Sequence, residues 1–300
     1  MATQMDWDPI QFFRSDYSPL NPFAILILNQ PINGSALSIL RRHACFVVCA
    51  DGGANRFYDL MKKNGGKESI DLPNAIVGDL DSIKPAVKQH YQNCGVPVIH
   101  NSDQESTDFT KCVEYLRANA SKIIASSPSQ AQTQVQQNHL DILIFGGLGG
   151  RVDQAFSQIH HLYTASQQDL TSTTNDGELY LISEESISFV LRRGRNTIRT
   201  TTAPTTTTKP SGNHSTTTAR PQNGNQTSYL EENIGILPVG VSSVISTEGL
   251  EWDVKDWKTE IGGRVSTSNH IRAEVIAVET TEPVLFTAEL AGRFKIGGSG

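Results

Sequence analysis

The sequence predicts an α/β domain, in which helices cover both faces of a parallel sheet, followed by a C-terminal all-β sandwich. Before residue 178, apolar runs such as Phe23–Leu28 alternate with helix-like segments, which is typical of a parallel sheet buried on both sides. After residue 178, short apolar runs follow one another without helical periodicity, as in a sandwich. The chain has 300 residues, which suffices for two such cores.

The expected domain map has three parts. Residues 1–20 are expected to form an N-terminal arm, residues 21–177 the α/β catalytic domain and residues 178–300 the sandwich. Two polar tracts of low complexity, Ser121–Asn138 and Arg192–Ser228, are interpreted as insertions. The second tract is expected to be a disordered Thr-rich loop because it offers few apolar residues to bury.

The individual elements follow from apolar runs and turn residues. In the α/β domain, strands are predicted at Phe23–Leu28, Phe46–Ala50, Ile76–Val77, Val96–His100 and Leu140–Phe145. Helices are predicted at Ser35–Arg42 and Ala54–Lys63, from Pro85, after Thr107, and from Asp153 to about Ala165. In the sandwich, strands are predicted at Leu179–Ser183, Ile187–Leu191, Ile234–Val239, Ser243–Ser246, Glu274–Val278 and Val284–Ala288.

Composition excludes several classes of protein. Lys and Arg number 25 against 31 Asp and Glu, a formal charge of -6, and no basic run suggests a nucleic-acid surface. The four cysteines show neither zinc-site nor disulfide spacing. Asp6, Asp8 and Pro9 stand where a signal peptide needs an apolar core, and no run is long enough to span a membrane. We therefore expect a cytoplasmic protein with no nucleic-acid or membrane partner.

The stretch Ala75–Ser82 places two carboxylates, Asp79 and Asp81, directly after a buried strand and a glycine. If the chain stays extended there, the two side chains point the same way, about 6–7 Å apart. Hard oxygen ligands suit Mg²⁺, which completes its shell with substrate phosphates. A solvated Asp-x-Asp turn is the alternative for this dipeptide.

Further acidic residues follow other predicted strands, namely Asp51, the loop Asp103–Asp108 and Asp153. Ligands of open α/β sheets bind at the carboxyl ends of the strands, so we expect a metal site there. Taken singly, Asp108 and Asp153 are also typical helix caps.

Two glycine clusters suit phosphate binding by backbone N–H groups. The first is Asp51–Gly53, which contains Gly52 and Gly53. The second is Gly146–Gly150. Neither cluster is a Walker A loop or a Rossmann fingerprint, and tight turns alone explain both. Lys111 and Arg151 add cations for phosphate, although either can be an ion-pair partner of a neighbouring aspartate. No nucleophile–base set is evident, which favours metal-assisted transfer of a phosphate-containing group.

In the sandwich, Gly249–Trp252 and Gly262–Asn269 combine an aromatic ring with hydroxyls and an amide. Such a set can hold a flat polar or cationic ring. The alternative is a core Trp beside a Ser/Thr-rich hairpin.

Together these strings resemble the thiamin pyrophosphokinase family of the eukaryotic, fungal type. The matching pieces occur in the family's order and cover the chain from about Phe23 to Leu290: Asp51–Asn55, Gly78–Ser82, Asp103–Cys112, Gly146–Gln154, Gly249–Trp252 and Ser266–Asn269. The two low-complexity tracts depart from the family pattern but interrupt none of these pieces.

The resemblance implies transfer of pyrophosphate from Mg·ATP to thiamin, with AMP as the second product, by a homodimer whose active sites lie between subunits. It implies metal and phosphate roles for Asp51, Asp79, Asp81, Gln104, Thr107, Asp108, Arg151 and Asp153. Among these, we expect Asp79, Asp81, Asp108 and Arg151 to be catalytic and Asp51, Asp79, Asp81, Thr107 and Asp108 to bind Mg²⁺. It places thiamin against Gln154, Trp252, Ser266, Ser268 and Asn269, some from the partner chain.

Two alternatives use the same residues. One is a metal-dependent phosphohydrolase or nucleotide-sugar transferase built on Asp79 and Asp81. The other is a nucleotide-sensing dimer without enzymatic activity, whose sandwich binds a partner.

Overall fold

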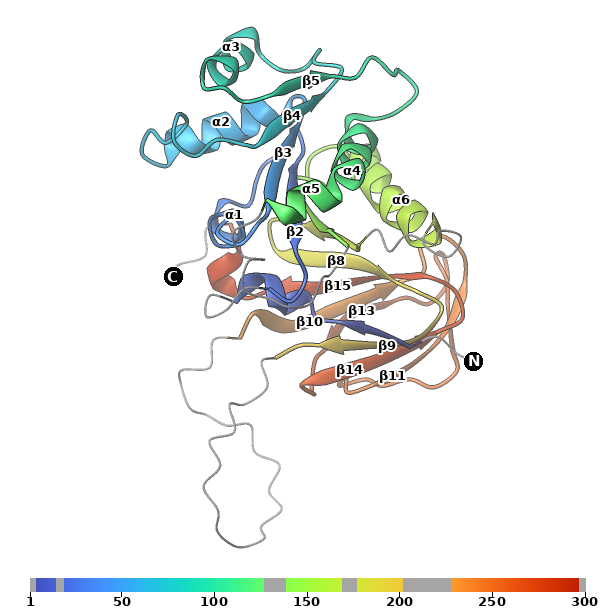
Figure 1. Ribbon diagram of the computed structural model, residues 1–300. Helices are drawn as coiled ribbons and strands as arrows, with labels where there is room; N and C mark the ends of the chain where they lie inside the picture. Colours follow the sequence, from blue (N-terminus) through green and yellow to red (C-terminus); the bar gives the residue numbers. More distant parts are fainter. Residues whose placement is uncertain (1–3, 15–18, 127–138, 169–176, 202–227, 297–300) are drawn as a thin grey trace, which may run out of the picture.

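The computed structural model describes residues 4–14, 19–126, 139–168, 177–201 and 228–296 (Figure 1). A ten-stranded sheet runs through the whole molecule. Its parallel half has the strand order β7-β6-β2-β3-β4-β5, and β6 lies beside β2 in register, with Ile25 opposite Leu143. These strands are β2 (Phe23–Ile27), β3 (Phe46–Ala50), β4 (Ala75–Gly78), β5 (Val98–His100), β6 (Asp141–Phe145) and β7 (Leu179–Ile182).

Helices cover both faces of the parallel half, as the sequence predicts. Alternate residues of β2 belong to different cores: Ile25 packs in one cluster with Phe57, whereas Leu26 packs in the other with Phe109. On the Ile25 side lie α1 (Gly34–Leu40), α2 (Gly53–Lys63) and α3 (Pro85–Asn93). On the other side lie α4 (Asp108–Ala118), α5 (Ala120–Ala125) and α6 (Val152–Gln168).

The C-terminal part is the expected β-sandwich, so the predicted fold class is confirmed. One layer is the antiparallel half of the ten-stranded sheet: β8 (Ser186–Leu191), β15 (Val284–Leu290), β10 (Leu230–Leu237) and β13 (Ser266–His270). The second layer, in strand order, is β1 (Gln4–Trp7), β9 (Gly194–Arg199), β14 (Val275–Thr280), β11 (Ser243–Glu248) and β12 (Trp257–Thr259). Because β6 pairs with β7 and β7 with β8, the sheet continues across residue 178.

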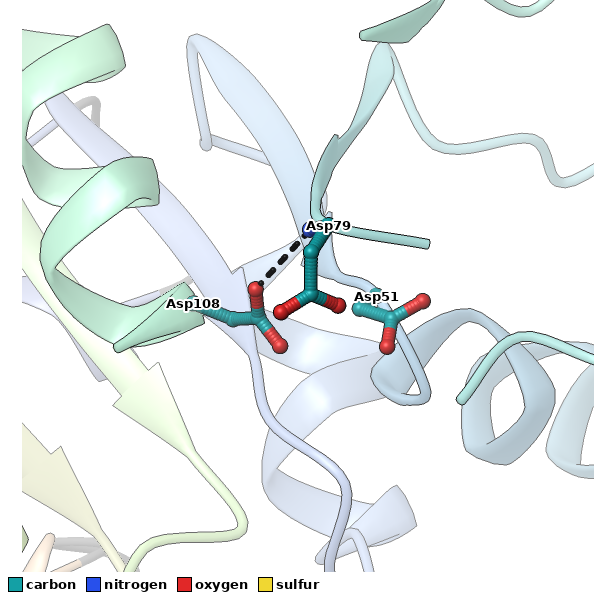
Figure 2. Close-up of side chains that lie close together, drawn as sticks. All are labelled: Asp51, Asp79 and Asp108. Carbon is teal, nitrogen blue, oxygen red and sulfur yellow. Dashed lines mark hydrogen bonds between the residues drawn. The ribbon is translucent and has the colours of Figure 1, made fainter. Parts of the chain in front are cut away.

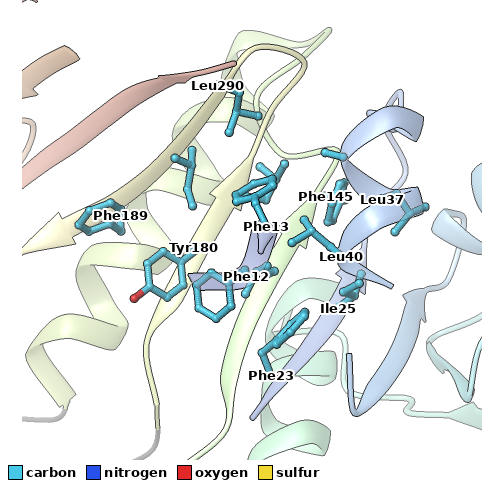
Figure 3. Packing of buried hydrophobic residues seen from close by; sticks show 14 of the residues in the cluster. Phe12, Phe13, Phe23, Ile25, Leu37, Leu40, Phe145, Tyr180, Phe189 and Leu290 are labelled. Atoms are coloured by element: carbon cyan, nitrogen blue, oxygen red, sulfur yellow. The ribbon is translucent and has the colours of Figure 1, made fainter. Parts of the chain in front are cut away.

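The N-terminal residues pack into the core, so the expectation of an arm over residues 1–20 is wrong for the described part. β1 pairs in parallel with β9, and the short 3-10 helix η1 (Pro9–Phe13) is buried. Trp7 stacks on Phe189 with ring centroids 4.8 Å apart, and its indole N–H donates to Asn196 Oδ1 at 3.0 Å. Phe12 packs against Phe23 of β2 and Tyr180 of β7, and Phe13 packs against Phe294 (Figure 3). Trp7 leaves no local pattern because its hydrogen-bond partner Asn196 lies 189 positions away.

The interpretation of Arg192–Ser228 as a disordered tract is also wrong at its start. Residues Gly194–Arg199 form β9 between β1 and β14, with Asn196 and Ile198 fully buried. A strand that buries one amide and one isoleucine has no apolar alternation to detect. Residues 202–227 of this tract lie outside the described part of the chain.

In Ser121–Asn138 the first residues belong to α5, which buries Ile123. The expected insertion therefore cannot begin at Ser121, and residues 127–138 lie outside the description. β12 and β13 were not predicted because their residues are mostly polar. Within the described ranges no helix combines the length and apolarity needed to cross a bilayer.

The packing of β1 yields a prediction about stability. Trp7→Ala should lower the free energy of unfolding by about 3–5 kcal/mol, because it removes a buried aromatic side chain and one of the N–H groups that donate to Asn196 Oδ1. Urea unfolding followed by circular dichroism measures this loss.

A matched control is Trp252→Ala, since that side chain is 54% exposed. It should change the unfolding free energy by about 0.5 kcal/mol or less. If Trp7→Ala lowers the unfolding free energy by no more than this small control value, the N-terminal strand does not contribute to the folded core.

Candidate active site

Three carboxylates gather at the carboxyl edge of the parallel sheet (Figure 2). Asp51 follows β3, Asp79 follows β4 and Asp108 begins α4. One carboxylate oxygen from each lies within 4.8 Å of the others. The sequence predicts all three at this edge, and the tertiary structure brings them to one point.

Gly78 makes this convergence possible. A Cβ at residue 78 would lie 2.7 Å from the Cβ of Asp51 and 2.8 Å from Oδ1 of Asp108. Neither distance is tolerable, and both neighbours are themselves ligand candidates. A side chain at residue 78 would therefore push the carboxylates apart.

Backbone N–H groups orient two of the carboxylates. The two oxygens of Asp51 accept from the N–H groups of Ser82 at 2.8 Å and Ile83 at 3.0 Å. Asp108 Oδ1 accepts from the N–H of Asp79 at 3.2 Å. The loop after β4 thus holds the aspartates that follow β3 and begin α4, and the three carboxylates form one hydrogen-bonded unit.

The buried ammonium of Lys111 supplies a positive charge to two of these carboxylates. Its Nζ lies 3.4 Å from both Asp79 Oδ2 and Asp108 Oδ1, and its side chain has no exposed surface. The expected role of Lys111 as a direct phosphate ligand does not fit this position, because the ammonium does not reach the solvent-accessible side of the carboxylates. Instead it offsets part of their mutual repulsion.

The three carboxyl groups have different pKa shifts. Burial raises the pKa of Asp51 and of Asp108, and the Asp79 charge adds to the rise at Asp108. Burial favours a higher pKa at Asp79 too. The hydrogen bond from the N–H of Asp81 and the ammonium of Lys111 outweigh this effect, so the pKa of Asp79 is lowered. Crowded acids with opposed shifts are typical of functional sites and are relieved by a cation.

Asp81 lies apart from this cluster. β4 ends at Gly78 and Leu80 has a φ of 66°, so the chain is not extended and the expectation that Asp79 and Asp81 point the same way is wrong. Asp81 is exposed, its backbone N–H donates to Asp79 Oδ1 at 3.3 Å, and its own carboxylate accepts from the Ser82 hydroxyl at 2.7 Å. Asp108 occupies the place that the sequence suggests for Asp81.

A cavity of about 310 Å³ opens beside the three carboxylates. Its walls come from the ends of β2, β3, β4 and β6 and from the starts of α4 and α6. Side chains and backbone that line it include Leu28, Asn29, Gln30, Asp51, Asp79, Ser82, Ser106, Thr107, Asp108, Phe109, Gly147, Gln154, Ser157 and Gln158. Besides the three carboxylates, the expected ligand residues Gly52, Thr107 and Gln154 are therefore part of this cavity.

The first glycine cluster serves close packing. A Cβ at Gly52 would meet Asn29 Nδ2 at 2.4 Å, and one at Gly53 would meet the Ile27 carbonyl oxygen at 2.2 Å. These glycines let the start of α2 approach the end of β2, and Gly52 also lines the cavity. The lack of room for a Cβ thus explains why glycine stands at both positions, without reference to a ligand.

Three expected phosphate residues are exposed outside the cavity wall. Arg151 and Asp153 form an ion pair at 2.5 Å near the start of α6, and Gln104 lies in the loop before α4. Hydrogen bonding within the pair raises the pKa of Arg151 and lowers that of Asp153. Arg151 is therefore charged at the rim and engaged by Asp153.

The sandwich residues assigned to thiamin form a separate group. The Trp252 ring is 54% exposed, whereas Asn269 is buried and accepts from the Trp252 N–H at 3.2 Å while donating to its carbonyl at 3.0 Å. Ser266 and Ser268 lie on β13 beside Asn269, and Ser268 has a φ of 56°. None of these residues lines the cavity of the same chain among the described residues.

Sequence reasoning missed several residues of the cavity. Asn29 and Gln30 follow β2 as Asp51 follows β3, so the rule applied to the other strand ends would have found them. Phe109, Ser157 and Gln158 were not considered as site residues, because a helix periodicity alone does not show which face meets a cavity.

Comparison with known proteins identifies the family. The catalytic-domain model of thiamin pyrophosphokinase matches residues 37–173, and the model of its vitamin B1 binding domain matches residues 221–285. Thiamine pyrophosphokinase 1 of Arabidopsis thaliana is 30% identical over 89% of this chain and 86% of its own length. Thiamine pyrophosphokinase of Saccharomyces cerevisiae is 28% identical over 89% and 85%.

Solved structures agree with these sequence matches. Yeast thiamin pyrophosphokinase superimposes with a TM-score of 0.74 at 25% identity, covering 96% of this chain and 91% of that one. The Candida albicans enzyme gives 0.72 at 26% identity, covering 96% and 93%. The resemblance found in the sequence motifs is thus confirmed along nearly the whole chain, and the protein belongs to the thiamin pyrophosphokinase family of ATP-dependent diphosphotransferases.

Proposed function

We propose that the chain transfers the terminal diphosphate of Mg·ATP to the hydroxyethyl oxygen of thiamin and releases AMP. The observation that carries this proposal is the group of Asp51, Asp79 and Asp108 at the ligand-binding edge of the sheet, in a chain of this family. Diphosphate transfer needs little covalent chemistry from the protein. It needs positioning and neutralisation of charge, which such a group supports.

The residues present fit a magnesium ion. Three carboxylates offer only oxygen donors, and one buried ammonium leaves part of their negative charge unbalanced. This is the donor set that Mg²⁺ prefers, and when bound the ion would neutralise charge on the polyphosphate. Asp51, Asp79 and Asp108 would hold it.

Each residue of this group has its own task. Asp51 is held by two backbone N–H groups and gives the site a rigid wall. Asp79, with its lowered pKa, remains ionised. Lys111 keeps the carboxylates of Asp79 and Asp108 together when no cation is present, which preorganises the site.

The other assigned residues remain proposals with different support. Thr107 lines the cavity beside Asp108 and is suited to a metal or phosphate contact. Asp81 would join the metal only after its carboxylate leaves the Ser82 hydroxyl. Gln104, Arg151 and Asp153 stand at the rim, where a polyphosphate extending from the cavity would meet them. Gly52 offers backbone at the cavity wall, whereas we now assign Gly53 to packing.

For thiamin we propose Gln154 in the cavity and Trp252, Ser266 and Ser268 on the sandwich. Asn269 would act through Trp252, because its amide already bonds both backbone groups of that residue. The exposed Trp252 ring suits a cationic thiazolium or a pyrimidine. Since these sandwich residues do not line the cavity of their own chain, we propose that the partner in a homodimer supplies them.

The domain map and the location are also proposals. We place the catalytic domain at about residues 21–177 and the thiamin-binding sandwich from residue 178, with β1 and η1 added to the sandwich side. The family matches at 37–173 and 221–285 fall within these two parts. We propose a cytoplasmic location and neither nucleic-acid nor membrane partners.

The products of the reaction test the proposed function. The purified protein with ATP, Mg²⁺ and thiamin should form AMP and thiamin diphosphate in equal amounts, as measured by chromatography. ADP or free phosphate without thiamin would instead support a phosphohydrolase. Nucleotide binding without any turnover would support the sensing dimer.

The carboxylate group yields a prediction about turnover. Asp79→Asn and Asp108→Asn should each lower kcat by on the order of 10³-fold, because each removes a carboxylate proposed to hold the Mg²⁺ that neutralises the transferring phosphates.

Asp59→Asn on α2 is a suitable control, since Asp59 lies outside the carboxylate group and does not line the cavity. It should retain the wild-type kcat. A folded Asp79→Asn or Asp108→Asn protein with near-normal kcat would rule out the assigned site.

The shared active site yields a third prediction. Asp79→Asn and Trp252→Ala chains should each be nearly inactive alone, whereas a mixture should recover activity. In a mixed dimer, one of the two sites combines the unchanged Asp79 of the Trp252→Ala chain with the unchanged Trp252 of the Asp79→Asn chain.

Native mass spectrometry confirms that the mixture contains heterodimers. A confirmed heterodimer population without recovered activity would place Asp79 and Trp252 in the site of one chain and contradict the proposed sharing.

A further inference from the structure

One glutamine in the cavity wall has a buried amide oxygen that lacks a hydrogen-bond partner. Gln158 lies on α6, lines the cavity and is only 7% exposed. Its Oε1 is buried, and no donor in the described part of the chain reaches it. Burying a carbonyl oxygen without a donor opposes folding, so the lack of a partner needs an explanation.

The structure makes a defined place for this side chain. A Cβ at Gly147 would lie 3.3 Å from Cγ of Gln158 and 3.1 Å from a methyl of Leu181, so the glycine leaves the room that Gln158 fills. One turn later on α6, the His161 ring stacks on Phe109 of α4 at 4.4 Å. Gln158 is thus confined between the strand end and the cavity.

The chemistry of the cavity wall changes from one side to the other. Asp51, Asp79 and Asp108 form the acidic side, whereas α6 contributes neutral polar groups. No Lys, Arg or His is among the described residues that line the cavity. The neutral side therefore has no cation for a phosphate, and it suits the uncharged ring of a substrate.

The missing partner of Gln158 is a donor. Phosphate oxygens only accept hydrogen bonds, so they cannot satisfy Oε1, whereas an exocyclic amine can. A carboxamide matches an amine that lies beside a ring nitrogen, because its oxygen accepts from the amine while its N–H donates to the nitrogen.

We propose that Gln158 is a specificity-determining residue that pairs with an aminopyrimidine edge of a bound substrate. This inference rests on the proposed function, because both substrates carry such an edge: the adenine of ATP and the aminopyrimidine of thiamin. In either case an analogue with a carbonyl in place of the amine presents an acceptor to Oε1 and is rejected.

The test compares each substrate with its oxo analogue by equilibrium binding. The probes are ATP against inosine triphosphate, and thiamin against oxythiamin, with Mg²⁺ present. The wild-type protein should bind the amino form about 10- to 100-fold more tightly in at least one pair. In Gln158→Leu that preference should fall to about 1, and the affected pair identifies the substrate that Gln158 contacts.

Two further measurements separate this role from a structural one. Gln158→Leu should unfold at the same temperature as the wild type or a higher one, since a leucine of similar size removes an unpaired polar group. Gln92→Leu, an exposed change on α3, should keep the amino preference. If Gln158→Leu does not fold, Gln158→Met serves instead, because it keeps the unbranched shape but lacks the amide oxygen that accepts from an amine.

Unchanged amino preferences for both pairs in a folded Gln158 variant would overturn the inference, as would a wild-type protein with no preference. Failure of the proposed function gives a different result. In that case the wild type forms no thiamin diphosphate, while the dependence of ligand preference on Gln158 can still be measured by binding.

Discussion

Mutual repulsion among three nearby carboxylates is the constraint on which the site depends. Asp51, Asp79 and Asp108 bring an oxygen each within 4.8 Å, an arrangement that like charges oppose. Three features make it tolerable: the missing side chain at Gly78, the backbone donors around the carboxylates and the buried ammonium of Lys111. The remaining negative charge is what a divalent cation would neutralise.

The ten-stranded sheet links this site to the rest of the molecule. Its parallel half presents the strand ends that carry the acidic residues, and its antiparallel half forms one layer of the sandwich. The two parts of the chain therefore share a backbone framework and do not depend on a linker alone. The N-terminal strand β1 adds to the second layer, and η1 contacts both α1 of the α/β part and β9 of the sandwich.

Residues inside and outside the matched strings differ in how they lie relative to the cavity. Lys111 and Asn269 both fall within motifs that the family resemblance marks, yet both are buried and act on neighbouring protein groups. Gln158 falls outside every matched string, yet it lines the cavity and has an amide oxygen without a hydrogen-bond partner. Lining the cavity, and not membership of a matched string, therefore distinguishes Gln158 from Lys111 and Asn269.

The sequence by itself determined the fold class, the order of most elements and the edge at which the acidic residues collect. These follow from local rules: apolar runs alternate with helices, and a polar residue after a parallel strand lies at one edge of the sheet. It did not show that Asp108, and not Asp81, joins Asp79, because the left-handed backbone at Leu80 and the approach of α4 arise only in the folded chain. The packing of Trp7 and the pairing of β9 were likewise decided by tertiary structure, since their stabilising contacts join residues far apart in sequence and leave no local pattern.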